Sequence, residues 1–251
     1  MKHSRQHAAA IGQKTELLPT ADCQLPAAKA VFLDKDGTLV ENVPYNVDPS
    51  RMRLARGAEG LPMLHRAGYR LIVVSNQSGV ARGYFAEDAL RPVERRLAEL
   101  LHEAGVPLAG FYYCPHHPKG VVPAYALACA CRKPAPGLIA QAAREHRIDL
   151  SRSWLVGDIL DDVEAGRRAG CRTVLIDNGN ETEWLLSAPR RPHHLAPDLA
   201  AAARLILGAI AGSAGILPRS QYPVDTVARL RSSPTGQPHR AFARVQSEGR
   251  L

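Results

Sequence analysis

Residues 31–40 read Val-Phe-Leu-Asp-Lys-Asp-Gly-Thr-Leu-Val, and this stretch decides the fold. Its apolar run ends abruptly in Asp34, Asp36 and Gly37. Buried parallel strands read as continuous apolar runs, and open α/β sheets carry their chemistry at the carboxyl ends of the strands. Two carboxylates at this spacing can share one Mg²⁺, with Asp34 attacking phosphorus and Asp36 moving protons. The alternative is a strand followed by an acidic turn, with Gly37 at a positive φ.

Apolar strand patterns alternate with helical patterns from Lys29 onward. We expect strands at 30–34, 70–75, 109–113, 153–157 and 172–176, and a weaker strand at 193–195. We expect helices at 57–67, 87–104, 136–147, 160–169 and 197–211. This alternation requires right-handed crossovers. It therefore predicts an α/β fold with a three-layer, Rossmann-like parallel sheet over residues 29–215.

The two ends of the chain lack this pattern. Residues 1–28 show no sustained period and predict a mobile arm, whereas 216–251 are rich in Pro, Ser, Arg and Gln and predict a disordered basic tail. No apolar run approaches the ~20 residues that span a bilayer, and the first residues do not resemble a secretory signal. The five cysteines form no secreted disulfide framework. We therefore expect a cytoplasmic protein that is not bound to a membrane.

The net charge of +8 is concentrated near the end of the chain, because residues 218–251 hold six arginines and only two acidic residues. The body is mildly basic, as suits a binder of anionic metabolites. We expect no nucleic-acid binding by the body, and the role of the tail stays open. A scaffold or nucleic-acid-binding protein acting through the tail is the alternative class, but it has no need of the polar residues at the strand ends.

The second and third candidate motifs combine hydroxyl, amide and cationic groups. The strand at 70–75 ends in Ser75-Asn76-Gln77-Ser78, where a hydroxyl and backbone N–H groups suit phosphoryl oxygens. The alternative is a helix cap made by Ser75 or Ser78. Lys133 follows Arg132 just before a predicted helix start, where a cation is electrostatically unfavourable. It is therefore expected to face an anion; the alternative is an exposed loop lysine.

The fourth motif is the apolar strand Trp154-Leu155-Val156-Gly157, which ends in Asp158. Asp158 is a candidate Mg²⁺ ligand, because Mg²⁺ prefers oxygen donors. For at least one of Asp161 and Asp162 we expect only a capping or charge-stabilising role at the following helix.

In this order on alternating strands, the four motifs resemble those of the haloacid dehalogenase-like phosphohydrolases. The resemblance covers roughly residues 29–215 and implies that fold, without a large cap domain. It also implies an aspartyl-phosphate on the first Asp of D-x-D, acid/base catalysis by the second, and a Ser or Thr and a Lys that steady the transferred group.

A cluster of cysteine and histidine residues follows the third strand. Cys114-Pro-His116-His117 is followed by Cys129-Ala-Cys131, two close pairs across a loop. Three thiolates and one imidazole make a closed tetrahedral set typical of structural Zn²⁺. We expect a zinc loop at 114–131 with Cys114, His116, Cys129 and Cys131 as ligands. The alternatives to a zinc site are a disulfide or unrelated buried thiols. His117 could also take the place of His116 as a ligand.

The strings FLDKDGT, SNQSGVARG, YYCPHHP, CRKPAPG and VGD resemble the D-glycero-D-manno-heptose 1,7-bisphosphate phosphatase family, close kin of the histidinol-phosphate phosphatases. The resemblance implies catalytic roles for Asp34, Asp36, Ser75 and Lys133. It implies Mg²⁺ held by Asp34, Asp36 (through its carbonyl) and Asp158. It implies substrate contacts from the residues Asn42, Val43, Pro44, Tyr45, Ser75, Asn76, Gln77, Ser78, Arg132 and Lys133. This sequence departs from the family pattern at two places. Residues 42–45 lack the Asp and Gly that many members have there, and Ile159 stands where Lys is common.

The implied function is removal of the C7 phosphate from heptose 1,7-bisphosphate through an aspartyl-phosphate, in heptose nucleotide-sugar synthesis for lipopolysaccharide core or surface glycans. The partner is then a small phosphorylated sugar, and we expect a monomer. A histidinol-phosphate or other small sugar-phosphate phosphatase is the alternative. The twelve residues between His116 and Cys129 favour the heptose branch. Arg132 is the candidate for a remote phosphate, and Arg82 either assists it or is a solvated residue.

Overall fold

The computed structural model describes residues 27–210. The tail at 216–251 and most of the arm at 1–28 lie outside the described residues. Ala28, the last residue of the predicted arm, is among the described residues. Its backbone N–H donates to the carbonyl of Arg147 at 3.0 Å, and its carbonyl accepts from the N–H of Asp149 at 2.7 Å.

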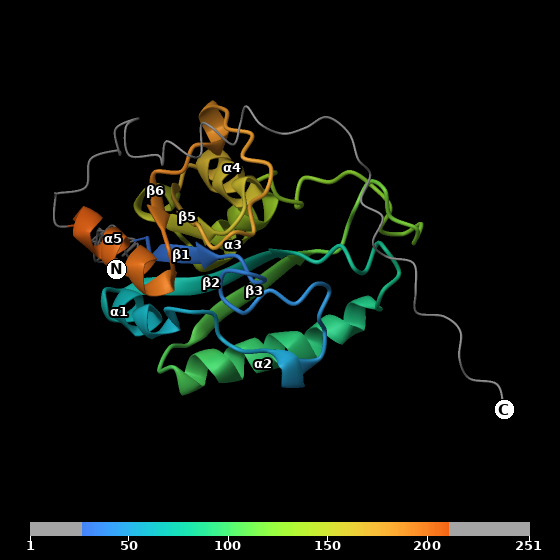
Figure 1. Cartoon of the computed structure of the whole chain (residues 1–251), viewed down its shortest axis with the longest axis horizontal. Coiled ribbons are helices and arrows are strands. Elements are labelled where there is room, and N and C mark those ends of the chain that lie inside the picture. The colour runs from blue at the N-terminus through green and yellow to red at the C-terminus, as the bar shows by residue number, and fades with distance from the viewer. Residues whose placement is uncertain (1–26, 211–251) are drawn as a thin grey trace, which may run out of the picture.

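A six-stranded parallel sheet in the order β3-β2-β1-β4-β5-β6 forms the centre of the molecule (Figure 1). The strands are β1 (Lys29–Leu33), β2 (Tyr69–Asn76), β3 (Leu108–Cys114), β4 (Trp154–Gly157), β5 (Arg172–Ile176) and β6 (His194–Ala196). The helices are α1 (Leu61–Arg66), α2 (Leu90–Glu103), α3 (Gly137–His146), α4 (Leu160–Ala169) and α5 (Leu199–Ile210). The predicted α/β class and parallel sheet are confirmed.

Side chains alternate across the sheet and divide the core into two layers. Val31 and Leu33 of β1 face α1, α2 and α5 in one cluster of buried residues. Ala30 and Phe32 point to the other face, against α3 and α4. Helices on both faces bury the central strands completely, which explains why those strands read as continuous apolar runs.

The expected element positions hold to within a few residues. The largest difference is the helix expected at 57–67, which divides into a 3₁₀ turn at Ala58–Gly60 and the short α1. Pro62 lacks an N–H and fits only the first turn of a helix, so the α-helix starts there. The helix expected at 87–104 likewise begins as a 3₁₀ turn before α2. The last strand is one residue later than expected.

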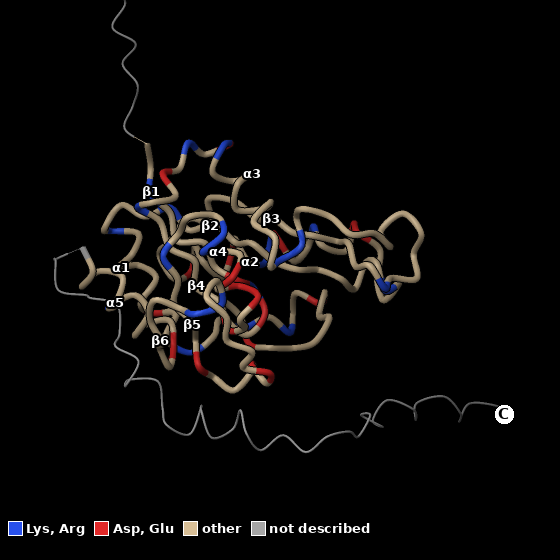
Figure 2. Tube along the Cα trace, turned by 90° about the horizontal axis from the view of Figure 1, so that it is seen from above, with Lys and Arg blue, Asp and Glu red and all other residues tan. Residues whose placement is uncertain are grey.

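The strand order reverses between the parallel strands β1 and β4: β2 and β3 are added on the far side of β1, and β5 and β6 on the far side of β4. Ligands in open α/β sheets bind at the carboxyl ends of such strands. The loops after β2 and β3 project together beyond this edge (Figures 1 and 2). They are joined where the Ala81 carbonyl accepts N–H groups from Val121 and Val122, at 2.7 and 3.0 Å.

Within residues 27–210, no helix has both the length and the apolar character needed to cross a membrane.

Candidate active site

Three carboxylates converge at the carboxyl edge of the sheet. Asp34 directly follows β1, Asp158 follows the neighbouring β4, and Asp162 lies in the first turn of α4. One oxygen from each lies within 4.8 Å of the other two, and all three residues are buried. Because the strands are parallel neighbours, the first residue beyond each end emerges at the same edge.

Lys133 is the cation that enters this group from the loop before α3. Its ammonium contacts the Asp34 carboxylate, lies 2.5 Å from Asp162 and donates to the carbonyl of Val74 at 2.9 Å. Burial alone would lower the pKa of Lys133, but the charges of Asp162 and Asp34 outweigh burial and raise it. Lys133 is therefore a buried, permanently charged group and not an exposed loop lysine.

Asn76 fixes the backbone of Lys133. Its side-chain amide accepts the Lys133 N–H and donates to the Lys133 carbonyl, both at 3.0 Å. This pair of hydrogen bonds joins the end of β2 to a segment that lies 57 residues away in the chain. Asn76 was expected to contact the substrate. In the structure its side chain instead holds the backbone of Lys133 in place.

Asp36 faces the same edge and lies beside polar groups from β2. The Gln77 amide donates to Asp36 at 3.1 Å and to the buried Ser75 hydroxyl at 2.8 Å. Lys35, almost fully buried, lies 2.5 Å from Asp36. Loss of hydration raises the pKa of Asp36; Lys35 opposes this shift and the Asp34 charge adds to it. A carboxyl group that keeps its proton to higher pH suits a general acid.

Asp158 is held by two donors, the Thr38 hydroxyl at 3.0 Å and the Asn180 amide at 2.8 Å. Burial, and then the charge of Asp34, raise the pKa of Asp158 to about 6. Gly37 passes close by with φ +85°, and a Cβ at this position would lie 2.3 Å from an Asp158 oxygen. Only glycine tolerates both this conformation and this approach.

The donor set fits a divalent cation. Three buried carboxylates with one lysine leave excess negative charge in a medium that screens it poorly. The charge of Asp34 adds to the burial that raises the pKa of Asp158. Mg²⁺ favours oxygen ligands and would relieve this excess charge. Asp34 and Asp158 directly follow the neighbouring strands β1 and β4 and are the candidate ligands, whereas Asp162 lies in the first turn of α4, where it pairs with Lys133 and accepts the Ile159 N–H.

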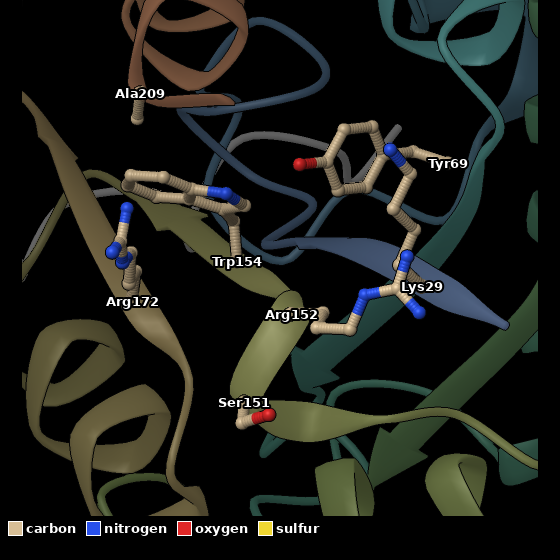
Figure 3. Close-up of a pocket in the computed structure, with 7 residues that line it drawn as sticks. All are labelled: Lys29, Tyr69, Ser151, Arg152, Trp154, Arg172 and Ala209. Atoms are coloured by element: carbon tan, nitrogen blue, oxygen red, sulfur yellow. The ribbon is translucent and has the colours of Figure 1, made fainter. Parts of the chain in front are cut away.

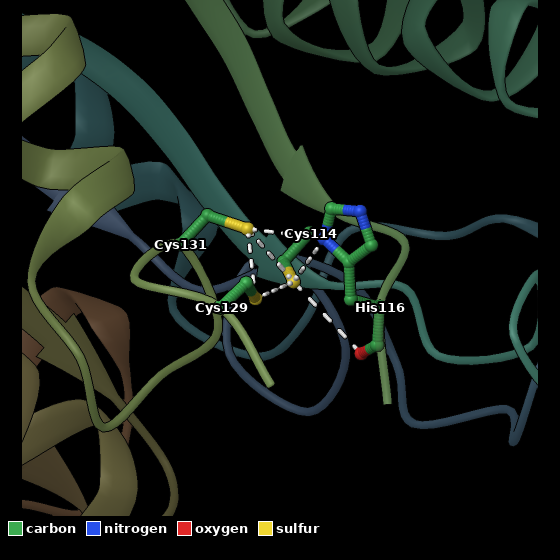
Figure 4. A group of neighbouring side chains, drawn as sticks. All are labelled: Cys114, His116, Cys129 and Cys131. Carbon is green, nitrogen blue, oxygen red and sulfur yellow. Dashed lines mark hydrogen bonds between the residues drawn. The ribbon is translucent and has the colours of Figure 1, made fainter. Parts of the chain in front are cut away.

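A second candidate metal centre lies in the loops after β3 (Figure 4). Sulfur atoms of Cys114, Cys129 and Cys131 lie 3.1 to 3.5 Å apart, and the His116 Nδ1 atom is 3.3 Å from Cys131. The cysteines are free thiols, so the disulfide alternative is wrong. Zn²⁺ with ~2.3 Å bonds to sulfur needs sulfur atoms about 3.8 Å apart, close to this spacing. The chemistry of the donor set thus fits zinc.

Two guanidinium groups lie next to this second centre. The Arg132 guanidinium donates to the His116 carbonyl at 3.4 Å. Arg82 has its Nη2 atom 3.3 Å from the Nε2 atom of His117, and its buried Nε has no partner among the described residues. His116 points to the sulfur atoms, while His117 points to Arg82.

The segment at 42–45 is exposed at the same edge. The Asn42 amide donates to the Asn180 side chain at 3.2 Å, which connects the segment to Asp158. Tyr45 has φ +55° and packs edge-on against Tyr84 with ring centroids 4.7 Å apart. Pro44 is exposed and Val43 half-buried. The backbone carbonyl of the remaining candidate, Ser78, accepts the Arg82 N–H at 3.0 Å.

Lys35, Thr38 and Asn180 lie in the site although no sequence pattern indicates a role for them, and the pattern indicates only capping for at least one of Asp161 and Asp162. Asp162 does accept the Ile159 N–H at 3.3 Å, as a capping residue would, but it also pairs with Lys133. Asp161 instead pairs with Arg190 at 3.2 Å. A buried aspartate beside apolar Val163 in a short helix is a signal that a charged partner is needed.

Comparisons with known proteins agree with this architecture. Residues 130–202 match a family model described as "HAD-hyrolase-like". The D-glycero-beta-D-manno-heptose-1,7-bisphosphate 7-phosphatase of Pasteurella multocida is 43% identical over 153 residues, which cover 60% of this chain and 83% of that protein. The corresponding alpha-named phosphatase of Photorhabdus laumondii is 38% identical over 157 residues, 61% of this chain and 85% of that protein.

A solved relative gives the same result. The D,D-heptose 1,7-bisphosphate phosphatase of B. bronchiseptica, crystallised with magnesium and phosphate, superposes with a TM-score of 0.59 at 29% identity. The match covers 72% of this chain and 99% of that one. The chain therefore belongs to the D-glycero-D-manno-heptose-1,7-bisphosphate 7-phosphatase family of haloacid dehalogenase-like hydrolases.

Proposed function

We propose that this protein is a Mg²⁺-dependent phosphatase that removes the C7 phosphate of D-glycero-D-manno-heptose 1,7-bisphosphate. The observation that carries the proposal is the assembly of Asp34, Asp36, Lys133 and Asp158 at one sheet edge. The relatives named for this activity supply the substrate class. The product is heptose 1-phosphate, a precursor for nucleotide-sugar synthesis.

In the first step, a carboxylate oxygen of Asp34 attacks phosphorus while the bond from phosphorus to the C7 oxygen breaks. Asp36 donates its proton to the departing sugar oxygen, a role favoured by its raised pKa. In the second step Asp36 takes a proton from water, which attacks the aspartyl-phosphate. Inorganic phosphate leaves and Asp34 is regenerated.

Ser75 and Lys133 hold the transferred group. Both polar groups lie at the end of β2, where the Ser75 hydroxyl accepts from the Gln77 amide and the Lys133 ammonium donates to the Val74 carbonyl. Both are buried, so they act in a medium where charge is stabilised more strongly than in water. Asp162 is a positioning residue, because it touches Lys133 and no group assigned to substrate.

Mg²⁺ would be held by Asp34, Asp158 and the backbone carbonyl of Asp36, and it supplies positive charge at the phosphoryl oxygens. The zinc centre of Cys114, His116, Cys129 and Cys131 is proposed as structural, because four protein ligands leave no open position. It adjoins Arg132 and Lys133 in the chain, so bound zinc fixes the loop that carries both cations.

The second phosphate of the substrate needs its own cations, and we assign Arg132 and Arg82. His117 Nδ1 accepts the Lys119 N–H at 3.0 Å, so the neutral ring carries its proton on Nε2. Loss of hydration and the nearby cations lower the pKa of His117 and favour this neutral form. The Nε2–H of His117 therefore faces another donor, Arg82 Nη2, at 3.3 Å. An oxygen of the substrate can accept from both.

A cytoplasmic location is proposed on two grounds. The described thiols of Cys114, Cys129, Cys131 and Cys171 are free, as a reducing compartment keeps them, and phosphorylated sugars are made and used there.

Phosphate release tests the function. The purified protein with Mg²⁺ is assayed on the alpha and beta anomers of heptose 1,7-bisphosphate, on fructose 1,6-bisphosphate and on histidinol phosphate. We expect kcat/KM at least ten times higher for a heptose bisphosphate than for the other two. A preference for histidinol phosphate would overturn the substrate assignment, and no release from any of the four would overturn the phosphatase assignment.

The remote cations are tested separately. Arg132→Gln should lower kcat/KM for heptose 1,7-bisphosphate far more than for a monophosphate without the remote group, because only the bisphosphate uses that binding energy. Arg95→Gln, an exposed arginine on α2, is the matched control. Equal losses on both substrates would reassign Arg132 to the reacting phosphate.

A further inference from the structure

A pocket lies at the amino edge of the sheet, the edge opposite to Asp34 and Asp158. Its volume is about 230 Å³, and its wall includes Lys29, Tyr69, Arg152, Trp154, Arg172 and Ala209 (Figure 3). A water molecule occupies only ~30 Å³, so the space can hold a small solute. β1 rises ~3.3 Å per residue over its five residues, which separates the pocket from Asp34 by roughly 16 Å.

Strand register brings the lining residues together. Lys29, Tyr69, Trp154 and Arg172 are the first residues of β1, β2, β4 and β5. Lys29 pairs with Tyr69 and Trp154 with Arg172 in the sheet. Tyr69 and Trp154 belong to the same buried cluster as Val31, and Lys29 lies two residues before Val31, so these side chains share one face. The end of α5, at Ala209, covers that face.

Three cationic side chains line this pocket, those of Lys29, Arg152 and Arg172. Within residues 27–210, none of the three forms an ion pair with an acidic residue. The Lys29 ammonium lies 4.2 Å from the Tyr69 ring centroid, and the Arg172 guanidinium lies 5.4 Å from that of Trp154. The rings orient two of the cations without neutralising them.

The neighbouring groups leave the positive charge only partly compensated. The charge of Arg152 acts on Lys29 and, after the hydrogen bonds from Ser151, also contributes to the lowered pKa of Asp149. Burial, and then the charge of Arg152, lower the pKa of Lys29. Asp149 is the acidic residue near Arg152 in the chain, but its carboxylate accepts the Ser151 N–H at 3.0 Å and the Ser151 hydroxyl at 2.6 Å. The carboxylate is thus already used to cap the turn that carries Arg152.

Cations also stabilise the carbonyl end of a helix, and α5 ends here. That interaction contributes about 0.3–1 kcal/mol and is met by a single cation in the last turn. It gives no reason for three cations to converge from β1, β5 and the turn before β4, which are separate rigid elements.

We propose that this pocket is a binding site for a small, multiply charged phosphate anion, distinct from the phosphatase centre. Arg152 and Arg172 offer planar guanidinium forks that grip phosphate oxygens in pairs, and Lys29 adds a point charge. The starts of β1 and β5 and the turn before β4 position the backbones of the three cations before the anion arrives, which lowers the entropic cost of binding.

Nuclear magnetic resonance of the indole N–H groups tests the proposal, because the chain has only two tryptophans. Trp154 lines the pocket. Trp184 lies after β5, in the loop whose Asn180 contacts Asp158, and reports on the catalytic edge. Inorganic pyrophosphate is titrated into the full chain without Mg²⁺. We expect a saturable shift of the Trp154 signal, larger than any shift of Trp184.

Two variants locate the binding. Lys29→Gln with Arg152→Gln leaves Arg172 on the Trp154 ring and should weaken pyrophosphate binding at least tenfold. Arg91→Gln with Arg95→Gln removes the same charge from the exposed face of α2 and should leave it unchanged. Absence of a saturable Trp154 shift, or equal weakening in both double variants, would overturn the proposal.

A further variant tests whether carboxylates of the chain outside the described residues compete with the anion. The full chain with Glu16→Gln, Asp22→Asn, Asp225→Asn and Glu248→Gln should bind pyrophosphate as the unmodified chain does. Binding that arises only after these four substitutions would mean that the chain's own carboxylates occupy the pocket, and the proposed site for a free anion would be abandoned.

Discussion

Replacing Lys133 by alanine should destabilise the protein strongly, because within residues 27–210 this lysine is the one cation paired with the fully buried carboxylate of Asp162. Asp162 has no solvent exposure, and its oxygen lies 2.5 Å from the Lys133 ammonium. Asp34 and the carbonyl of Val74 lose the same partner. Removal of one member of a buried ion pair costs about 3–5 kcal/mol, since the remaining charge stays out of water.

The measurement is urea unfolding at pH 8.5, without added Mg²⁺ and with any bound zinc retained. For a chain of this size, the expected loss corresponds to a fall in Tm of roughly 6–20 °C. Lys119→Ala is the control, an exposed lysine whose loss should change the free energy of unfolding by less than about 0.5 kcal/mol.

The double variant Lys133→Ala with Asp162→Asn separates charge from packing. The asparagine keeps an oxygen for the Ile159 N–H but carries no charge. It should therefore recover part of the stability lost in Lys133→Ala, about 1–3 kcal/mol. Burial raises the pKa of Asp162, so acidification that protonates it should also reduce the cost of Lys133→Ala. Additive losses in the double variant, or a stable Lys133→Ala protein, would refute the electrostatic reasoning.

Four other changes test the site and the fold. Asp34→Asn should abolish phosphate release, because an amide is a poor nucleophile; near-normal turnover in purified protein would exclude the aspartyl-phosphate route. Cys129→Ser with Cys131→Ser should remove about one zinc per chain, measured by metal analysis, and lower activity; zinc-free unmodified protein would count against the centre. Gly37→Ala should lower Mg²⁺ affinity and activity, because its Cβ would lie 2.3 Å from an Asp158 oxygen; unchanged calorimetric binding of Mg²⁺ would contradict this. Burial, then the charge of Arg167, lower the pKa of His193 from 6.5 to about 4, so the folded state resists protonation. The free energy of unfolding should therefore fall between pH 6.5 and 4, by about 1–2 kcal/mol once solvent screening of this partly exposed ring is allowed for. His193→Gln should flatten that slope in urea unfolding, and an unchanged slope would assign the acid sensitivity to other groups.

Much of the fold could be predicted because its signals are local. The apolar run before Asp34 and the one before Asp158 mark buried strands by composition alone, and Gly68 and Gly105 mark helix ends. The helix around Leu61 was predicted too long, since Pro62 restricts it to a short α-helix after a 3₁₀ turn.

The candidate site was predictable only in part. The spacing of the D-x-D string and of the paired Cys and His residues predicts two metal-binding sites. The role of Asn76 in fixing the Lys133 backbone was not predictable, because an amide beyond a strand reads equally well as a substrate contact. The pairing of Asp162 with Lys133 was also missed, since a carboxylate in the first turn of a helix has a sufficient local explanation as a cap.

The sequence by itself determined the alternation of strands and helices, the strand ends that carry Asp34 and Asp158, and the composition of the cysteine cluster, because each depends on residues a few positions apart. Only the tertiary structure decided which distant groups meet. Lys133 reaches Asp34 across 99 residues, and Lys29 shares a pocket with Arg172. These contacts follow from the strand order β3-β2-β1-β4-β5-β6, which sets which strand ends become neighbours and which no local pattern encodes.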